Sequence, residues 1–251
     1  CHPINVCRKM KICLVLGLVA VAAFCYADAR RSPKKPDFYY FPPSPPCRLV
    51  MMAAAALKVD MNMKMIDLMK GEQLTPDFLK INPQHTIPVL THDGLTISES
   101  RAIAAYLANS RPSGEKIYPK DPKKRAMVDQ MLYFDMGKLY QRFLDLYPPM
   151  MFMGASWDKE KAEKLDEAVK MLEEYLTRNK WAAGNQMTLA DISLLASVST
   201  LEAVNYDFSK YPKIMAWSEN SKKMIPDYEK VNEGVMVWKT MMDKYKQEHP
   251  M

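Results

Sequence analysis

The stretch DFYYFPPSPPCR, from Asp37 to Arg48, decides the fold. Its first five residues alternate like a short strand, and its four prolines exclude regular structure in the middle. The alanine- and methionine-rich run that follows predicts a helix over residues 45–57. A strand, a stiff turn and a helix start therefore meet at Ser44. We expect unpaired N–H groups and the positive end of the helix dipole beside its hydroxyl, an arrangement that stabilises an anion such as a thiolate.

Composition limits the classes of function. The chain has 251 residues, 48% of them hydrophobic, which is enough for one large or two small domains with a full core. Its net charge of +6 is concentrated in residues 1–36, because the remainder carries 28 basic and 28 acidic side chains. A neutral body has no basic face for phosphate backbones, so we expect no nucleic-acid partner. No metal-binding motif is present, and we expect no metal.

Residues 1–36 have a different composition, and we expect them to lie outside the fold. Basic residues precede an apolar run over 12–25, and small residues follow at 27–29, which together have the parts of a secretory signal peptide. The run is too short for a comfortable membrane span, so no membrane partner is expected. Two interpretations are open: a genuine export signal over residues 10–29, or upstream sequence joined to a cytosolic protein. The second is favoured, with a cytoplasmic location, because Cys47 alone cannot form a disulfide framework in the body.

A first domain is predicted over residues 37–112. The alternating segment MNMKMI (61–66) predicts a second strand, and the order strand, helix, strand favours a parallel pair. A short helix follows with Thr75 as its cap. Two strands then flank the turn at Asp93-Gly94, which is a strong hairpin signal, and a helix over 98–109 closes the layer.

Two further places in this domain can bind a small ligand. Before the third strand, Pro88 occupies a position where a cis peptide can present the backbone of Ile87 to an extended peptide. At the start of the last helix, Ser98 and Ser100 suit a carboxylate, and Glu99 suits an ammonium group. One ligand with a thiol, a peptide backbone, a carboxylate and an ammonium group would satisfy these places and Ser44 together. Glutathione has those groups.

The rest of the chain predicts a linker over residues 113–120 and a helical domain over residues 121–251. A first helix, capped at Asp121, is expected to run to about Tyr147, where Pro148 and Pro149 would stop it. An amphipathic helix over residues 165–176 follows. The capping box from Thr188 to Asp191 begins a nearly all-apolar helix at the centre of this domain. Two last helices are expected over residues 212–224 and 228–246.

Three segments together carry a resemblance to a known family: DFYYFPPSPPCR, LMKGEQLTPDFLKINPQHTIPVL (68–90) and ISESRAIAAYL (97–107). They resemble the thioredoxin-like domain of a cytosolic glutathione S-transferase of the insect delta class, with epsilon relatives next. The likeness continues without a large gap from Asp37 to near the C-terminus. It implies an α/β thioredoxin-like domain followed by an all-α domain, glutathione as co-substrate, and a homodimer.

The resemblance also assigns roles to residues. Ser44 matches the catalytic serine, whose hydroxyl donates to the glutathione sulfur. The implied glutathione-binding residues are Leu68, Gln73, His85, Thr86, Ile87, Pro88, Glu99, Ser100 and Arg101. The implied wall of a pocket for small apolar electrophiles is Met136, Tyr140, Phe143 and Tyr147, which could equally be ordinary core.

Some positions depart from the family pattern. Pro43 and Pro45 flank Ser44 where relatives carry small residues, and Pro45 removes any backbone donor at its position. Gln73 occupies a place where many relatives have a histidine. Cys47 completes an S-x-x-C pattern that excludes dithiol exchange, and we expect its thiol to be a buried small hydrophobe.

The predicted function is conjugation of the glutathione thiolate to small apolar electrophiles, a detoxification reaction. Two alternatives are open. The chain could be a non-catalytic protein that keeps the fold and binds apolar ligands, or it could be a glutathione-dependent peroxidase or isomerase. The sequence does not identify the electrophile.

Overall fold

A computed structural model describes residues 34–249 of the chain. The signal-like segment expected over residues 10–29 lies outside the described residues. Within residues 34–249, no helix is both long enough and apolar enough to cross a membrane.

A four-stranded mixed sheet forms the first part of the fold, with the strand order β2-β1-β3-β4. β1 and β2 are parallel, as the order strand, helix, strand predicts, and the other two pairs are antiparallel. Phe38 and Leu90 are paired across β1 and β3 and are fully buried, so the middle of the sheet is part of the core. The strands are β1 (Asp37–Tyr40), β2 (Asn62–Met65), β3 (Val89–His92) and β4 (Leu95–Ile97).

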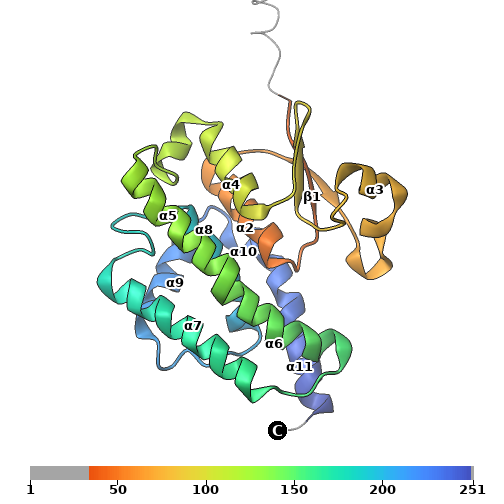
Figure 1. The fold of residues 1–251 in the computed structure, drawn as a ribbon, viewed down its shortest axis with the longest axis vertical. Coiled ribbons are helices and arrows are strands. Elements are labelled where there is room, and N and C mark those ends of the chain that lie inside the picture. Colours follow the sequence, from red (N-terminus) through yellow and green to blue (C-terminus); the bar gives the residue numbers. More distant parts are fainter. Residues whose placement is uncertain (1–33, 250–251) are drawn as a thin grey trace, which may run out of the picture. The chain divides into compact units, whose positions relative to one another are not determined.

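Three helices cover this sheet: α2 (Pro45–Leu57), α3 (Pro76–Ile81) and α4 (Ser100–Asn109). In Figure 1, α2 and α4 lie together on one side of β1 and α3 lies on the other. α3 begins as predicted, because the Thr75 hydroxyl accepts a hydrogen bond from the Phe78 amide at 3.4 Å. The hairpin turn is also confirmed, with Asp93 and Gly94 both at positive φ. This is the expected thioredoxin-like arrangement.

The remaining chain is helical. Its helices are α5 (Pro122–Phe134), a π-helical segment (Asp135–Leu139), α6 (Tyr140–Met153), α7 (Lys159–Arg178), α8 (Leu189–Ala203), α9 (Pro212–Met224), α10 (Tyr228–Val231) and α11 (Met236–Glu248). A 3-10 helix (Pro112–Lys116) takes up part of the predicted linker over residues 113–120.

Helix α8 lies at the centre of the helical part, as its apolar sequence predicts. Every residue from Leu189 to Leu201 is buried, and the helix packs against α2, α5, α9 and α11. Its start is the predicted capping box, in which the Asp191 carboxylate accepts from the Thr188 amide at 2.8 Å. Because α8 contacts α2 directly, the two parts of the fold share one continuous core.

Two predicted helix boundaries are wrong. The helix expected to stop at Pro148 continues through both prolines to Met153 and ends where Gly154 takes a φ of 65°. A proline inside a helix costs roughly 3 kcal/mol, whereas burying an aromatic or long apolar side chain contributes about 1.5–3 kcal/mol. Tyr147 and Met150, on either side of the prolines, are both buried, and their burial favours continuing the helix.

The second wrong boundary concerns the helix expected over residues 228–246. The chain forms the short α10, a 3-10 turn (Glu233–Val235) and then α11. At Gly234 the backbone comes so close to Pro42 that an added methyl group would overlap the Pro42 carbonyl. We infer that this close approach determines where the helix is interrupted. The periodicity of the sequence does not reveal the interruption.

Candidate active site

The predicted glutathione-binding segments meet at one edge of the sheet. Tyr39 pairs with Val89, and Leu90 pairs with Ile97, so the end of β1, the start of β3 and the end of β4 lie side by side. β2 ends at the same edge, because Met65 pairs with Tyr40 in a parallel register. The topology therefore brings the loops that carry Ser44, Ile87, Glu99 and Gln73 to a common edge.

Ser44 caps helix α2. Its hydroxyl oxygen accepts a hydrogen bond from the Cys47 amide at 3.4 Å, and its own amide donates to the Phe41 carbonyl at 3.0 Å. The side chain is half-buried, and the hydroxyl proton is not used by the capping bond. The same serine can therefore cap the helix and donate to an incoming sulfur.

The helix start itself has fewer donors than the sequence suggested. Pro45 and Pro46 carry no N–H, the Cys47 amide is held by the Ser44 hydroxyl, and the Arg48 amide donates to the Ser44 carbonyl at 3.0 Å. The expectation of unpaired N–H groups beside Ser44 is therefore wrong, because the two prolines remove them. The hydroxyl of Ser44 is the remaining donor of this helix start.

Cys47 is a buried structural residue. Its side chain is fully buried, and burial raises the pKa of its thiol to about 12. A thiol with this pKa stays protonated near neutral pH and is a poor nucleophile. The interpretation of Cys47 as a small hydrophobe is confirmed.

The loop before β3 is organised by a residue that sequence reasoning missed. Asn82 is buried, donates from Nδ2 to the Thr86 carbonyl at 2.9 Å and accepts from the Gln84 amide at 3.1 Å. This fixes the turn that exposes His85 and leads to the Ile87–Pro88 peptide, which is cis as predicted. The signal in the sequence was the pair Asn82-Pro83, because asparagine before proline favours a turn.

At the start of α4, Glu99 is exposed and Ser100 is buried. Arg101 turns towards the helical part, where its Nη2 donates to Asp135 Oδ2 at 2.6 Å. Its guanidinium also lies 5.9 Å from the centroid of the Tyr140 ring. The Arg101 charge is thus satisfied inside the protein, whereas Glu99 faces outward at the sheet edge.

Asp135 is a second residue that sequence reasoning missed. Its carboxylate is fully buried and accepts hydrogen bonds from Arg101, from Ser193 and, at 2.7 Å, from Ser197. A charged residue between the apolar positions Leu132 and Leu139 was the available signal.

The loop after β2 carries the two other predicted contacts. Asp67 caps the turn that contains Leu68, accepting from the Met69 amide at 3.0 Å. In the same loop, the Gln73 side-chain oxygen is buried and has no hydrogen-bond partner among residues 34–249. A buried polar atom without a partner is unusual in a folded protein, and a ligand group can supply the missing one.

Three of the four predicted electrophile-pocket residues come together. Phe143 stacks with Tyr140 and Tyr147 at centroid distances of 6.2 and 5.4 Å, and Phe143 and Tyr147 are almost fully buried. Met136 lies elsewhere, on the rim of a hollow of about 450 Å³ that also includes Arg101 and Tyr133. Met136 lies within the π-helical segment, whose wider turn shifts this side chain out of the stripe formed by the other three residues.

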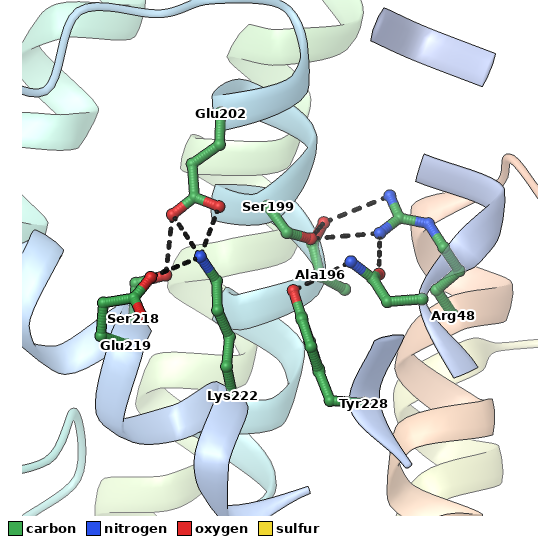
Figure 2. A network of polar contacts seen from close by, with 9 residues as sticks. Arg48, Ala196, Ser199, Glu202, Ser218, Glu219, Lys222 and Tyr228 are labelled. Atoms are coloured by element: carbon green, nitrogen blue, oxygen red, sulfur yellow. Dashed lines mark hydrogen bonds and ion pairs between the residues drawn. The ribbon is translucent and has the colours of Figure 1, made fainter. Parts of the chain in front are cut away.

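Helix α2 is tied to the helical part through Arg48. Figure 2 shows its side chain reaching Ser199 of α8, with Tyr228 nearby. Arg48 also donates to Asn232, to Thr200 and to the Ala196 carbonyl, so the acceptors that it meets among residues 34–249 are all neutral. Burial lowers the pKa of this guanidinium to about 10. The residue is fixed in position directly after the Ser44 loop.

Comparison with known proteins gives the family. Sequence models of the glutathione S-transferase N-terminal and C-terminal domains match residues 37–109 and 143–221. Glutathione S-transferase D7 of Anopheles gambiae is 45% identical over 200 residues, which are 79% of this chain and 92% of that protein. The chain belongs to the glutathione S-transferase family. As a transferase of this family it is an enzyme, and the resemblance drawn from its three motifs is confirmed.

Solved structures place this glutathione S-transferase beside the delta class. A delta-class glutathione transferase of Nilaparvata lugens is 47% identical, with a TM-score of 0.81, over 84% of this chain and 99% of that one. A glutathione transferase homologue from Drosophila mojavensis, solved with bound glutathione, is 35% identical, with a TM-score of 0.80, over 84% of this chain and 97% of that one. The thioredoxin-like domain and the helical domain of the transferase correspond to the fold of these relatives.

Proposed function

We propose that this glutathione S-transferase stabilises the glutathione thiolate through the hydroxyl of Ser44 and transfers it to small apolar electrophiles. The observation that carries the proposal is the donor count at the start of α2. With Pro45 and Pro46 lacking N–H groups and the next two amides occupied, the Ser44 hydroxyl is the donor left for a sulfur anion.

Glutathione would lie along the sheet edge as an extended peptide. Its backbone would pair with Ile87 ahead of Pro88, and its γ-glutamyl end would reach Glu99 and Ser100. Its glycyl end would lie near Gln73 and His85, with Leu68 and Thr86 completing the site. In this proposal Arg101 supports Glu99 and Ser100 from inside the protein and does not pair with a charge of the ligand, because its guanidinium is already paired with Asp135.

The chemical step follows from the hydrogen bond at sulfur. A free thiol has a pKa of about 8.5, and a hydrogen bond to a charged group contributes roughly 1.5–3 kcal/mol, enough to lower the pKa by about one to two units. The thiol proton leaves to solvent, and the thiolate attacks an electrophilic carbon of the second substrate. A carbon–sulfur bond forms and a leaving group such as chloride departs with its electron pair. Tyr140, which is partly exposed, would offer an apolar side to that substrate, and the buried Phe143 and Tyr147 would pack behind it.

The test is Ser44→Ala, assayed with an aryl chloride. We expect turnover to fall by roughly 10- to 100-fold while glutathione affinity changes little, because the hydroxyl acts on the sulfur rather than on the rest of the peptide. Ultraviolet absorbance of the bound thiolate near neutral pH should be present in the native enzyme and absent in the variant. Unchanged conjugation in Ser44→Ala would refute the role of Ser44.

A matched control separates chemistry from helix capping, since Ser44→Ala also removes a cap worth about 1 kcal/mol. Asp158 caps α7 in the same way, accepting from the Lys161 amide at 3.1 Å. Asp158→Ala should lose similar stability and keep full turnover. Glutathione binding without a thiolate signal in the native enzyme would favour a binding protein, and a panel of peroxides and isomerisable substrates would test the other alternative.

We also propose that the enzyme is a cytoplasmic homodimer that acts in detoxification. A hollow of about 450 Å³ on the α4–α5 face, with Tyr133 exposed beside it, supports a protein contact there. Light scattering should give twice the chain mass, and a monomer would contradict the dimer. Mass spectrometry of the N-terminus from native tissue tests the location, because cleavage near residue 29 would indicate export.

A further inference from the structure

The loop that carries Ser44 cannot hold itself in place with its own amide groups. Pro42, Pro43, Pro45 and Pro46 have no N–H, and the Ser44 amide is used within the loop by the Phe41 carbonyl. The backbone of the loop can therefore form hydrogen bonds to the rest of the protein only as an acceptor, through its carbonyl oxygens. Its position depends on donors and packing supplied from elsewhere in the chain.

That support comes from the last part of the helical domain. The indole Nε1 of Trp238 donates to the Pro43 carbonyl at 2.7 Å, and both residues are buried. One helical turn earlier, Gly234 packs directly on the Pro42 carbonyl. Asn232 accepts from the guanidinium of Arg48. We call residues 232–238 the C-terminal brace.

Trp238 is itself held firmly. Its ring meets Phe143 edge-on at a centroid distance of 5.0 Å and Phe152 at 5.9 Å, both on α6. Aromatic pairs of this geometry contribute roughly 0.5–1.5 kcal/mol each beyond their burial. The indole N–H is therefore presented to Pro43 from a fixed direction.

We propose that Trp238 is a positioning residue for the Ser44 hydroxyl. The hydrogen bond to the Pro43 carbonyl fixes the peptide group that leads into Ser44, and so fixes the direction from which its hydroxyl meets the sulfur. Without this bond the Pro43 carbonyl has no buried donor, and the prolines alone do not fix the position of the loop. The inference rests on the proposed function, in which Ser44 stabilises the thiolate.

The test is Trp238→Phe, which removes the N–H and retains an aromatic ring for Phe143 and Phe152. We expect kcat to fall roughly tenfold and the pKa of the bound thiol to rise by about one unit in ultraviolet titration, because a misplaced Ser44 hydroxyl would weaken its hydrogen bond to the sulfur, and a hydrogen bond is worth about that much. KM for glutathione should stay within about twofold, since the sites at Ile87 and Glu99 are untouched. Gly234→Ala, which pushes on Pro42, should shift the thiol pKa in the same direction.

Trp217→Phe is the matched control. Trp217 is buried and donates its indole N–H to Asp191 at 2.9 Å, so the control loses a comparable bond away from the loop. Trp217→Phe should lower the melting temperature and leave the thiol pKa unchanged. If Trp238 had only a structural role, Trp238→Phe would give the same result as this control.

The outcomes separate the two ideas. If Ser44→Ala abolishes the thiolate signal but Trp238→Phe titrates like the native enzyme, the positioning role is overturned and the proposed function stands. A fall in kcat with an unchanged thiol pKa also overturns it, because Trp238 would then act on the electrophile side. If the native enzyme gives no thiolate signal, both ideas fail.

Discussion

Replacing Asp135 by asparagine should destabilise the enzyme by about 3 kcal/mol, because it removes the buried carboxylate that forms an ion pair with Arg101. Asparagine has nearly the same shape, and its amide can still bond the hydroxyls of Ser193 and Ser197. What disappears is the ion pair at 2.6 Å between a fully buried carboxylate and a guanidinium whose side chain is 14% exposed. At an effective dielectric constant near 20, two charges about 4 Å apart attract by roughly 4 kcal/mol.

The measurement is urea unfolding followed by far-ultraviolet circular dichroism at one fixed protein concentration, since a dimer makes apparent stability depend on concentration. The control is Asp129→Asn on α5, the helix that directly precedes the π-helical segment of Asp135. Asp129 is half-exposed and accepts from the Tyr118 hydroxyl at 2.9 Å, so its loss should stay below about 1 kcal/mol.

A double-mutant cycle identifies the cause. In the Asp135→Asn variant the Arg101 guanidinium has no carboxylate partner, and Arg101→Met removes this unpaired charge. The variant with both changes should therefore be more stable, by at least about 2 kcal/mol, than the sum of the two single losses predicts. A loss below 1 kcal/mol in Asp135→Asn, or strict additivity in the cycle, would refute the reasoning.

Three other predictions concern single residues. Cys47 should resist thiol reagents up to about pH 10 in the folded enzyme, because its pKa is about 12 and its side chain is buried; peptide mass spectrometry with and without denaturant checks this, and rapid native labelling would contradict it. Asp191→Asn should lower the free energy of unfolding by several kcal/mol, because the carboxylate accepts from four donors, and a drop below 1 kcal/mol in urea unfolding would count against this. Gly154→Ala should cost about 1 kcal/mol because of its φ of 65°, whereas Gly137→Ala, in a helical segment with open space, should be neutral or stabilising; equal melting temperatures would disprove the distinction.

The parts of the fold that could be predicted from the sequence are those set by local signals. Thr75 and Asp121 cap their helices where expected, the turn at Asp93-Gly94 joins two strands, and the capping box begins the buried helix α8. Each of these depends on residues within a few positions of one another. The parallel pairing of β1 with β2 likewise follows from the order strand, helix, strand.

What could not be predicted depends on contacts far apart in sequence. Arg101 meets Asp135 34 residues later, and Trp238 meets Pro43 195 residues away. Local propensity predicts that the two prolines in α6 end the helix, whereas the burial of Tyr147 and Met150, which depends on distant contacts, favours its continuation. The extra width of the π-helical segment, which moves Met136 off the predicted stripe, likewise has no local signal in the sequence.

The proline-rich loop has a spectroscopic consequence. Across residues 42–46, the backbone carries a single amide hydrogen, that of Ser44, which is bonded to the Phe41 carbonyl at 3.0 Å. In a nitrogen-15 correlation spectrum, one resonance therefore represents the whole segment, and its exchange with deuterium reports every opening of the turn. The residue proposed for catalysis is thus also a built-in reporter of the loop around it.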